Sequence, residues 1–196
     1  MGISNNRSFL AKIKFNGEDV IFYDKHSYGM NFSSQKNSIT TPQGPAKTGD
    51  VLASFTPDIW DSPEFAYFIG HDDYSYKIQF RSGNHHAKYL GTASDSTRAL
   101  RIYPDAVSAT SFTLYDSNLN IITLDDITST NKSVYLQQLQ GPFIKRQLID
   151  DQMYSYSGRR GNLVKLDIEI VERGFDGIEN YGFSRSAGHF LRLDSN

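Results

Sequence analysis

Two stretches of the chain, FTPDIWDSPEFAY at residues 55–67 and IYPDAVSATSFTL at residues 102–114, share their landmarks in the same order. Pro57-Asp58 recurs as Pro104-Asp105, and Phe65 recurs as Phe112, each 47 positions later. Repetition at a fixed period of 20 to 50 residues is the sequence pattern of repeat architectures. We therefore expect a fold built from similar units rather than one irregular domain.

Further landmarks extend the repeat on both sides. Ile78-Gln79-Phe80 matches Ile122-Thr123-Leu124, and Tyr89-Leu90 matches Tyr135-Leu136, which places the period near 46. A fainter third copy runs from Leu148-Ile149-Asp150-Asp151 through the alternating residues 163–170 to Phe190-Leu191. Each unit holds about four short strands separated by Asp, Asn, Ser and Gly turns. An all-β, three-fold barrel is predicted, with a four-bladed β-propeller as the alternative.

Upstream of the repeat, residues 8–24 form the clearest local pattern. Phe9, Ala11, Ile13 and Phe15 alternate with other residues at the two-residue period of a half-buried strand. Asn16-Gly17 follows, the pair best suited to a tight hairpin turn, and Val20-Ile21-Phe22-Tyr23 continues as a second strand. Residues 33–50 are rich in Ser, Thr, Gly and Pro and predict a long loop. We expect residues 1–50 to pack, as hairpin and loop, on the same domain as the repeat region 51–196.

The composition excludes several classes of protein. The chain has 196 residues, with 20 basic and 22 acidic side chains, no cysteine, and 13 Phe, 12 Tyr and one Trp. A net charge of −2 argues against a charge-driven nucleic-acid binder, and the aromatic content argues against disorder. No run of 18 apolar residues predicts a membrane span, and the N-terminal residues lack a signal-peptide pattern. Cytoplasmic synthesis is expected, and the absence of cysteine also fits non-classical release.

The spacing within one repeat resembles a known fold family. Lys88-Tyr89-Leu90-Gly91, Leu100-Arg101-Ile102, Phe112-Thr113-Leu114 and Ile121-Ile122-Thr123-Leu124 follow one another as in a repeat of the fascin-like and lectin-like β-trefoils. The resemblance covers residues 51–193 and implies a β-trefoil with binding sites in its turns. The Gln-x-Trp triplet of ricin-type trefoils is missing, so the sugar sites that depend on it are not carried over.

Aromatic and acidic residues gather in the turns of the first unit. Sugar binding uses an aromatic face for the apolar side of the ring and polar side chains for the hydroxyls. Two turns combine these groups, and they are the candidate carbohydrate-binding residues: Asp58, Trp60 and Asp61, then His71, Asp72, Asp73 and Tyr74. The simpler interpretation is a barrel cap for Trp60 and ordinary turn chemistry for the acidic residues. We expect a non-catalytic, lectin-like protein whose partner is a glycan or glycoprotein.

Two other functions stay open. A protein-binding trefoil, such as a protease inhibitor or a toxin or virulence targeting module, would use loop 33–50 as its contact surface. A hydrolase would need His71 or His85 to meet two carboxylates, and no nucleophile motif is present. His85 and His86 are adjacent and would point to opposite faces of a strand, so neither a metal nor another cofactor is expected. Arg98, Arg101 and Arg159-Arg160 are interpreted as scattered solvated cations, and the sequence gives no oligomeric state.

Overall fold

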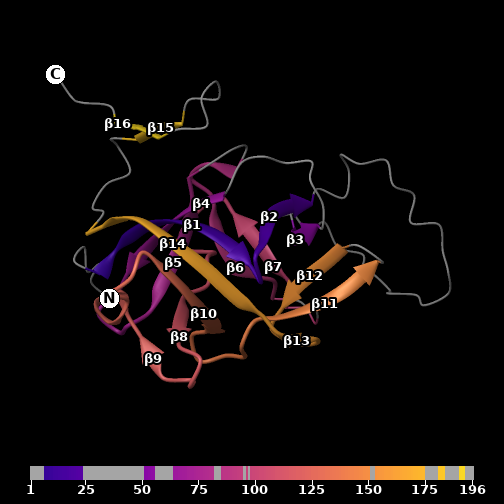
Figure 1. Ribbon diagram of the computed structural model, residues 1–196. Coiled ribbons are helices and arrows are strands. Elements are labelled where there is room, and N and C mark those ends of the chain that lie inside the picture. Colours follow the sequence, from indigo (N-terminus) through magenta and orange to yellow (C-terminus); the bar gives the residue numbers. More distant parts are fainter. Residues whose placement is uncertain are drawn as a thin grey trace, which may run out of the picture.

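The computed structural model describes residues 7–23, 51–55, 64–81, 85–94, 96, 98–150, 153–174, 181–183 and 190–192 (Figure 1). This part of the chain is all-β. Its strands are β1 (Phe9–Phe15), β2 (Glu18–Tyr23), β3 (Val51–Phe55), β4 (Glu64–Gly70), β5 (Tyr76–Phe80), β6 (Tyr89–Thr92), β7 (Leu100–Tyr103), β8 (Phe112–Tyr115), β9 (Ile121–Ile122), β10 (Asn131–Gln138), β11 (Lys145–Asp150), β12 (Met153–Ser157), β13 (Asn162–Leu163), β14 (Lys165–Arg173), β15 (Tyr181–Phe183) and β16 (Phe190–Arg192). One short 3₁₀ helix, η3 (Leu124–Asp126), follows β9.

The predicted hairpin at residues 8–24 is confirmed. β1 and β2 pair antiparallel, and the turn residues Asn16 and Gly17 have φ values of 50° and 79°. Positive φ at both central positions is the geometry that matches the twist of hairpin strands. The Asn16 backbone also binds β14, because its amide donates to the Lys165 carbonyl at 2.8 Å and its side-chain oxygen accepts from the Lys165 amide at 2.9 Å. The hairpin turn is thereby fixed to the last strand of the barrel.

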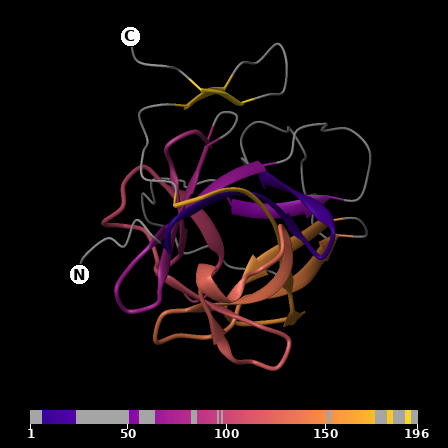
Figure 2. The same cartoon turned by 60° about the vertical axis from the view of Figure 1, so that its left-hand side comes forward.

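Six of the strands close into an antiparallel barrel, in the order β1–β4–β5–β8–β10–β14 and back to β1. Figure 2, turned from the view of Figure 1, shows these strands surrounding one core. The predicted all-β barrel is confirmed at this level. In the described part of the chain, fourteen strands belong to one hydrogen-bonded sheet, and β15 and β16 pair only with each other. A propeller would instead divide the strands among separate radial blades.

The remaining long strands form hairpins between barrel strands. The β2–β3 hairpin lies between β1 and β4, β6–β7 between β5 and β8, and β11–β12 between β10 and β14. The three hairpins also contact one another, since β3 pairs with both β12 and β7, and Ala99 bridges to Ser157. Pairing among the three hairpins therefore closes the end of the barrel at which they meet.

Alternating residues of the six barrel strands fill the core, together with residues of the hairpins, of η3 and of the connecting segments. Phe9 stacks on Phe68 with ring centroids 4.4 Å apart, and Phe15 stacks on Tyr156 at the same separation. The high aromatic content is therefore used largely for packing, where each ring buries a large apolar area. The buried cluster is Phe9, Ala11, Ile13, Phe15, Ala66, Phe68, Tyr76, Ile78, Phe80, Leu90, Leu100, Ile102, Phe112, Leu114, Ile122, Leu124, Ile127, Val134, Leu136, Ile144, Tyr156, Val164, Leu166, Ile168 and Ile170.

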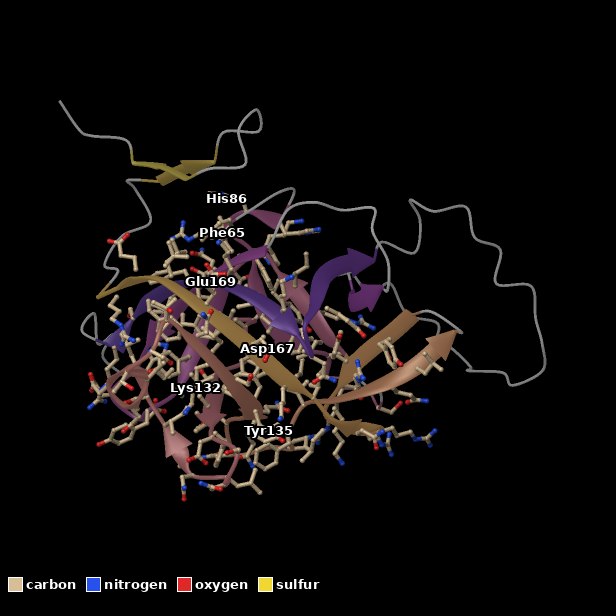
Figure 3. All side chains as sticks on the ribbon, in the orientation of Figure 1. Phe65, His86, Lys132, Tyr135, Asp167 and Glu169 are labelled. Carbon is tan, nitrogen blue, oxygen red and sulfur yellow. The ribbon has the colours of Figure 1, made fainter. Side chains whose placement is uncertain are left out.

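The outer face of β14 and its neighbours carries the complementary polar residues (Figure 3). The Lys12 ammonium lies 2.9 Å from the Glu169 carboxylate. Asp167 accepts a hydrogen bond from the Gly17 amide at 2.7 Å and another from the Ser133 hydroxyl at 2.5 Å. This alternation of apolar inward and polar outward positions is what the two-residue period of a strand dictates.

Two of the repeat landmarks do not occupy equivalent positions. Ile78-Gln79-Phe80 lies in barrel strand β5, whereas Leu124 begins the 3₁₀ helix η3. Tyr89-Leu90 lies in hairpin strand β6, whereas Tyr135-Leu136 lies in barrel strand β10. These two matches are wrong because short alternating segments of Tyr, Ile and Leu resemble one another in any strand. Phe65 and Phe112 each lie near the start of a barrel strand that follows a hairpin, in β4 and β8 respectively.

Candidate functional site

The described half of the predicted carbohydrate-binding set lies in the turn from β4 to β5. His71 donates its amide to the Ser75 carbonyl at 2.9 Å, and Tyr74 donates its amide to the His71 carbonyl at 3.2 Å. Tyr74 has a φ of 62°, and its half-exposed ring lies under the Arg7 guanidinium, 4.6 Å from the ring centroid. Asp73 accepts from the Ser75 hydroxyl at 2.6 Å and from the Ser75 amide at 3.2 Å. The Asp73 carboxylate thus stabilises the turn, and one face of Tyr74 is covered.

The other three predicted residues, Asp58, Trp60 and Asp61, lie outside the described residues, as does loop 33–50. Asp72 is exposed in the 71–75 turn. Both ring nitrogens of His71 are buried, and in the described part of the structure neither has a hydrogen-bond partner. The structure therefore joins four of the seven predicted residues in one turn, where Asp73 has a structural role.

Other acidic residues of the turns also bind their own backbone. Asp105 accepts from the Ser108 amide at 2.8 Å, and this hydrogen bond holds the pKa of the Asp105 carboxyl below its usual value. Asp116 accepts from the Asn120 and Asn118 amides, both at 2.8 Å, and the Asn120 amide is the main cause that lowers the pKa of Asp116. Carboxyls of lowered pKa stay ionised near neutral pH. Such ionised carboxylates can stabilise turns, but they are poorly suited to donate a proton in catalysis.

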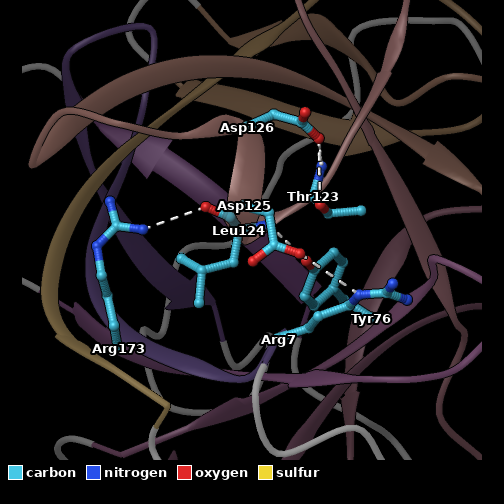
Figure 4. A network of polar contacts seen from close by, with 7 residues as sticks. All are labelled: Arg7, Tyr76, Thr123, Leu124, Asp125, Asp126 and Arg173. Carbon is cyan, nitrogen blue, oxygen red and sulfur yellow. Dashed lines mark hydrogen bonds and ion pairs between the residues drawn. The ribbon is translucent and has the colours of Figure 1, made fainter.

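The barrel end that carries the 71–75 turn is covered by η3 (Figure 4). The backbone amide of Leu124 donates to the buried Tyr76 hydroxyl at 3.0 Å. Arg173, at the end of β14, donates to the carbonyls of Leu124 at 3.1 Å and Ser129 at 3.2 Å, and also to the Ile127 carbonyl. One guanidinium thus supplies donors to three carbonyls of the segment around η3. These hydrogen bonds join η3 and the residues after it to barrel strands β5 and β14.

Further polar contacts fix η3 at its start. Asp126 accepts from the Thr123 amide at 2.8 Å and the Thr123 hydroxyl at 3.1 Å, and the two residues form a capping box. The Arg7 guanidinium lies 3.8 Å from the Asp125 carboxylate, a partly exposed pair that contributes little energy. Because these side chains already have partners, we interpret the network as structural contacts that hold η3 on the barrel end, and not as a ligand site.

An open concave site lies where the β6–β7 and β11–β12 hairpins meet. It is a depression of about 540 Å³ lined by Ser94, Ser96, Arg98, Pro142, Gly158 and Arg159, which we call the arginine depression. Its walls come from the β6–β7 loop, the β10–β11 connection and the residues that follow β12. Residues far apart in the sequence therefore form one surface where two hairpins meet.

Backbone contacts hold the walls of the arginine depression together. Gly158 donates its amide to the Arg98 carbonyl at 3.1 Å, next to the bridge between Ala99 and Ser157. The Arg159 guanidinium donates to the Ser96 carbonyl at 2.5 Å, which joins the β12 side to the β6–β7 loop. Gly158 packs so tightly that a Cβ there would lie 2.7 Å from Pro142 Cγ. Glycine is thus needed for the close approach of the two walls.

The chemistry of the arginine depression differs from the predicted aromatic turns. The six lining residues supply two guanidinium groups and two serine hydroxyls, and none is acidic or aromatic. Such a surface donates many hydrogen bonds and carries positive charge. The sequence interpretation missed it, because Ser96 and Arg159 are 63 positions apart and no spacing rule joins them. The available signal was that both arginines lie in short polar segments, residues 94–98 with two serines and residues 157–161 with one serine and two glycines.

Comparison with known proteins gives no relative from which a function could be carried over. No family model matches the chain, and no curated protein or solved structure matches it. The described residues include no helix with the length and apolar character needed to cross a membrane. Within the same residues, no three His, Asp or Glu side chains lie together in a way that could hold a metal ion. The geometry of the two sites is therefore the basis on which we infer a function.

Proposed function

We propose that the chain is a non-catalytic, lectin-like carbohydrate-binding protein with the β-trefoil architecture. Each of three units would comprise a barrel strand, a hairpin and a second barrel strand: β1 to β4, β5 to β8, and β10 to β14. The hairpin order and the closed six-strand barrel support this arrangement. So do three turns that follow the first barrel strand of each unit, where Asn16, Ala87 and Gln140 all have positive φ. In this three-unit arrangement, the N-terminal hairpin belongs to the first unit.

The arginine depression is the observation that carries the binding proposal. It is open and concave, and it lies between loops of two units. Loops on a rigid barrel are where binding residues usually occur. Serine hydroxyls and guanidinium groups are suitable partners for the oxygen atoms of a sugar, and Pro142 adds a small apolar wall. The depression therefore offers both hydrogen bonding and shape to a saccharide.

A binding role fits the acidic residues better than catalysis. Proton transfer in hydrolysis requires an acid and a base near the scissile bond. The carboxylates of Asp73, Asp105 and Asp116 accept hydrogen bonds within their own turns, and the described residues that line the arginine depression include no acidic one. The predicted pair of turns, with Trp60 and Tyr74 as its aromatic members, stays a second proposed location for the sugar.

A glycan array tests the proposal directly. The parent protein should bind a restricted group of glycans, and Ser96→Trp should abolish that binding because the indole fills the depression. Ser117→Trp, in the exposed β8–β9 turn, is the matched control and should bind like the parent. Binding that survives Ser96→Trp but is lost in Trp60→Ala would place the sugar at the predicted turns. A parent protein that binds no glycan would refute the carbohydrate proposal.

A further inference from the structure

We propose that the arginine depression selects glycans that carry an anionic substituent, with a sulfate group as the preferred one. This inference depends on the proposed carbohydrate function and makes its ligand class specific. It starts from the two arginines, Arg98 and Arg159, which line the same depression although they come from different hairpin regions. Their exposed side chains place two positive charges beside a concave surface.

The two guanidinium groups retain hydrogen-bonding capacity. The side chain of Arg98 has no hydrogen bond or ion pair to any residue in the described part of the structure. Arg159 uses one nitrogen to donate to the Ser96 carbonyl, and its remaining donors have no partner there. By contrast, Arg173 binds three carbonyls, and Arg146 lies 3.4 Å from the Glu18 carboxylate. With respect to the described residues, Arg98 and Arg159 thus keep donors for an incoming ligand.

One contact preorganises the site. Because the Arg159 guanidinium is held at 2.5 Å from the Ser96 carbonyl, part of its side-chain entropy is already lost before a ligand arrives. Arg98 has a φ of 47°, and its carbonyl is bound by the Gly158 amide at 3.1 Å. Both arginines therefore start from backbone positions that are fixed relative to each other.

The lining favours an anionic group over a neutral sugar ring. None of the six lining residues is aromatic, so a neutral pyranose would lack a flat face on which to stack. Guanidinium groups match the geometry of sulfate, phosphate and carboxylate oxygens and form charge-assisted hydrogen bonds with them. The serine hydroxyls can donate to the same anion. The net charge of the chain is −2, so the attraction comes from this local pair and not from a basic protein as a whole.

Calorimetric titration of the full chain tests the inference. The probes are a heparin tetrasaccharide, its fully desulfated N-acetylated counterpart, a hyaluronan tetrasaccharide with carboxylates only, and inorganic sulfate. We expect the sulfated tetrasaccharide to bind at least about tenfold more tightly than the desulfated one and than hyaluronan, since both of these keep only their carboxylates. Inorganic sulfate should bind most weakly. Affinity should fall as salt rises, because exposed charges are screened.

Variants locate the binding. Arg98→Gln and Arg159→Gln should each weaken the sulfated probe about tenfold, which is roughly 1.4 kcal/mol. Arg159→Lys keeps the charge but loses the planar fork, so its affinity should fall between those of the parent and the Gln variant. Lys165→Gln, which removes one exposed positive charge from β14, is the control and should leave affinity unchanged. Circular dichroism and melting temperature confirm that each variant is folded.

The outcomes separate this inference from the proposed function. Equal binding of sulfated and desulfated tetrasaccharides, unaffected by Arg98→Gln, would overturn the sulfate preference and the role of the arginines, and would leave the carbohydrate function standing. No binding of any glycan would overturn both. Inorganic sulfate or a deoxythymidine 20-mer that binds as tightly as the tetrasaccharide would show an anion site without glycan recognition, and would overturn the inference as well.

Discussion

The hydroxyl of Tyr76 accepts a hydrogen bond of 3.0 Å from the backbone amide of Leu124, 48 positions away in the sequence. Tyr76 is the first residue of barrel strand β5, and Leu124 is the first residue of η3. Both residues are buried, with exposed fractions of 1% and 3%. A single side-chain oxygen thus ties the segment that covers this barrel end to the barrel wall, and water has little access to replace it.

Tyr76→Phe should lower the free energy of unfolding by about 1–3 kcal/mol, because the buried Leu124 amide would lose its partner. Urea denaturation measures the change. Tyr135→Phe is the matched control, because that tyrosine is only half-buried in β10, and it should cost less than about 0.5 kcal/mol. Equal losses in the two variants would mean that the Tyr76 hydroxyl adds nothing beyond the ring.

The same hydroxyl should give the fold an alkaline limit. Burial raises the pKa of Tyr76 to about 12, above its ordinary value near 10. A raised folded-state pKa means that the stabilisation is complete below pH 10 and is lost as pH rises from about 10 to 12. The stability advantage of the parent over Tyr76→Phe should therefore shrink across that range. Denaturation curves at pH 8 and pH 11 provide the measurement, and a constant difference would contradict the assignment.

Arg173→Met should destabilise the chain by about 1–2 kcal/mol. The guanidinium donates to the Leu124 and Ser129 carbonyls at 3.1 and 3.2 Å and to that of Ile127, and hydrogen bonds from a charged group are stronger than neutral ones. Water can reach part of this exposed site, which keeps the loss moderate. Thermal unfolding measures it, with the exposed Arg160→Met as control. Matching melting temperatures would show that Arg173 does not fasten η3.

Two glycines provide a matched pair for testing backbone geometry. Gly161 has a φ of 103°, and a Cβ there would lie 1.9 Å from the Arg146 carbonyl oxygen. Gly174 has a φ of 65° and open space around it. Gly174→Ala should cost only the left-handed penalty of about 1–2 kcal/mol. Gly161→Ala adds a backbone clash and should cost clearly more, to the point of lost soluble expression. Comparable melting temperatures would refute the predicted clash between Gly161 and Arg146.

Local sequence patterns predicted the individual strands and turns of this fold better than they predicted which segments occupy equivalent positions in it. The alternation from Phe9 to Phe15 and the Asn16-Gly17 turn identified the first hairpin, because both signals are contained in a few neighbouring residues. The long-range matches were less reliable. Residues 24–50 separate β2 from β3, so the sequence comparison placed the start of the first unit at residue 51. It then matched Tyr135, which lies in barrel strand β10, with Tyr89, which lies in hairpin strand β6.

The candidate site was predicted less well than the fold. The acidic turn at residues 71–74 was found because Asp and aromatic residues are adjacent there, yet the carboxylate of Asp73 binds its own turn. The arginine depression was missed because Arg98 and Arg159 meet only through the pairing of hairpins. Such pairing depends on tertiary register, and a single sequence does not encode it in any spacing between the two arginines.

The pairing of β1 with β14 has a mechanical consequence. The two strands are antiparallel, and Phe9 lies opposite Arg173 at one end of the ladder while Phe15 lies opposite Leu166 at the other. A force that pulls Phe9 and Arg173 apart would load the hydrogen bonds between the two strands one after another, starting from that end of the strand pair. Bonds that are loaded singly resist less than bonds sheared together. Tension applied at these two points would thus open the barrel at a low force, because β1 and β14 would separate from one end of the ladder to the other.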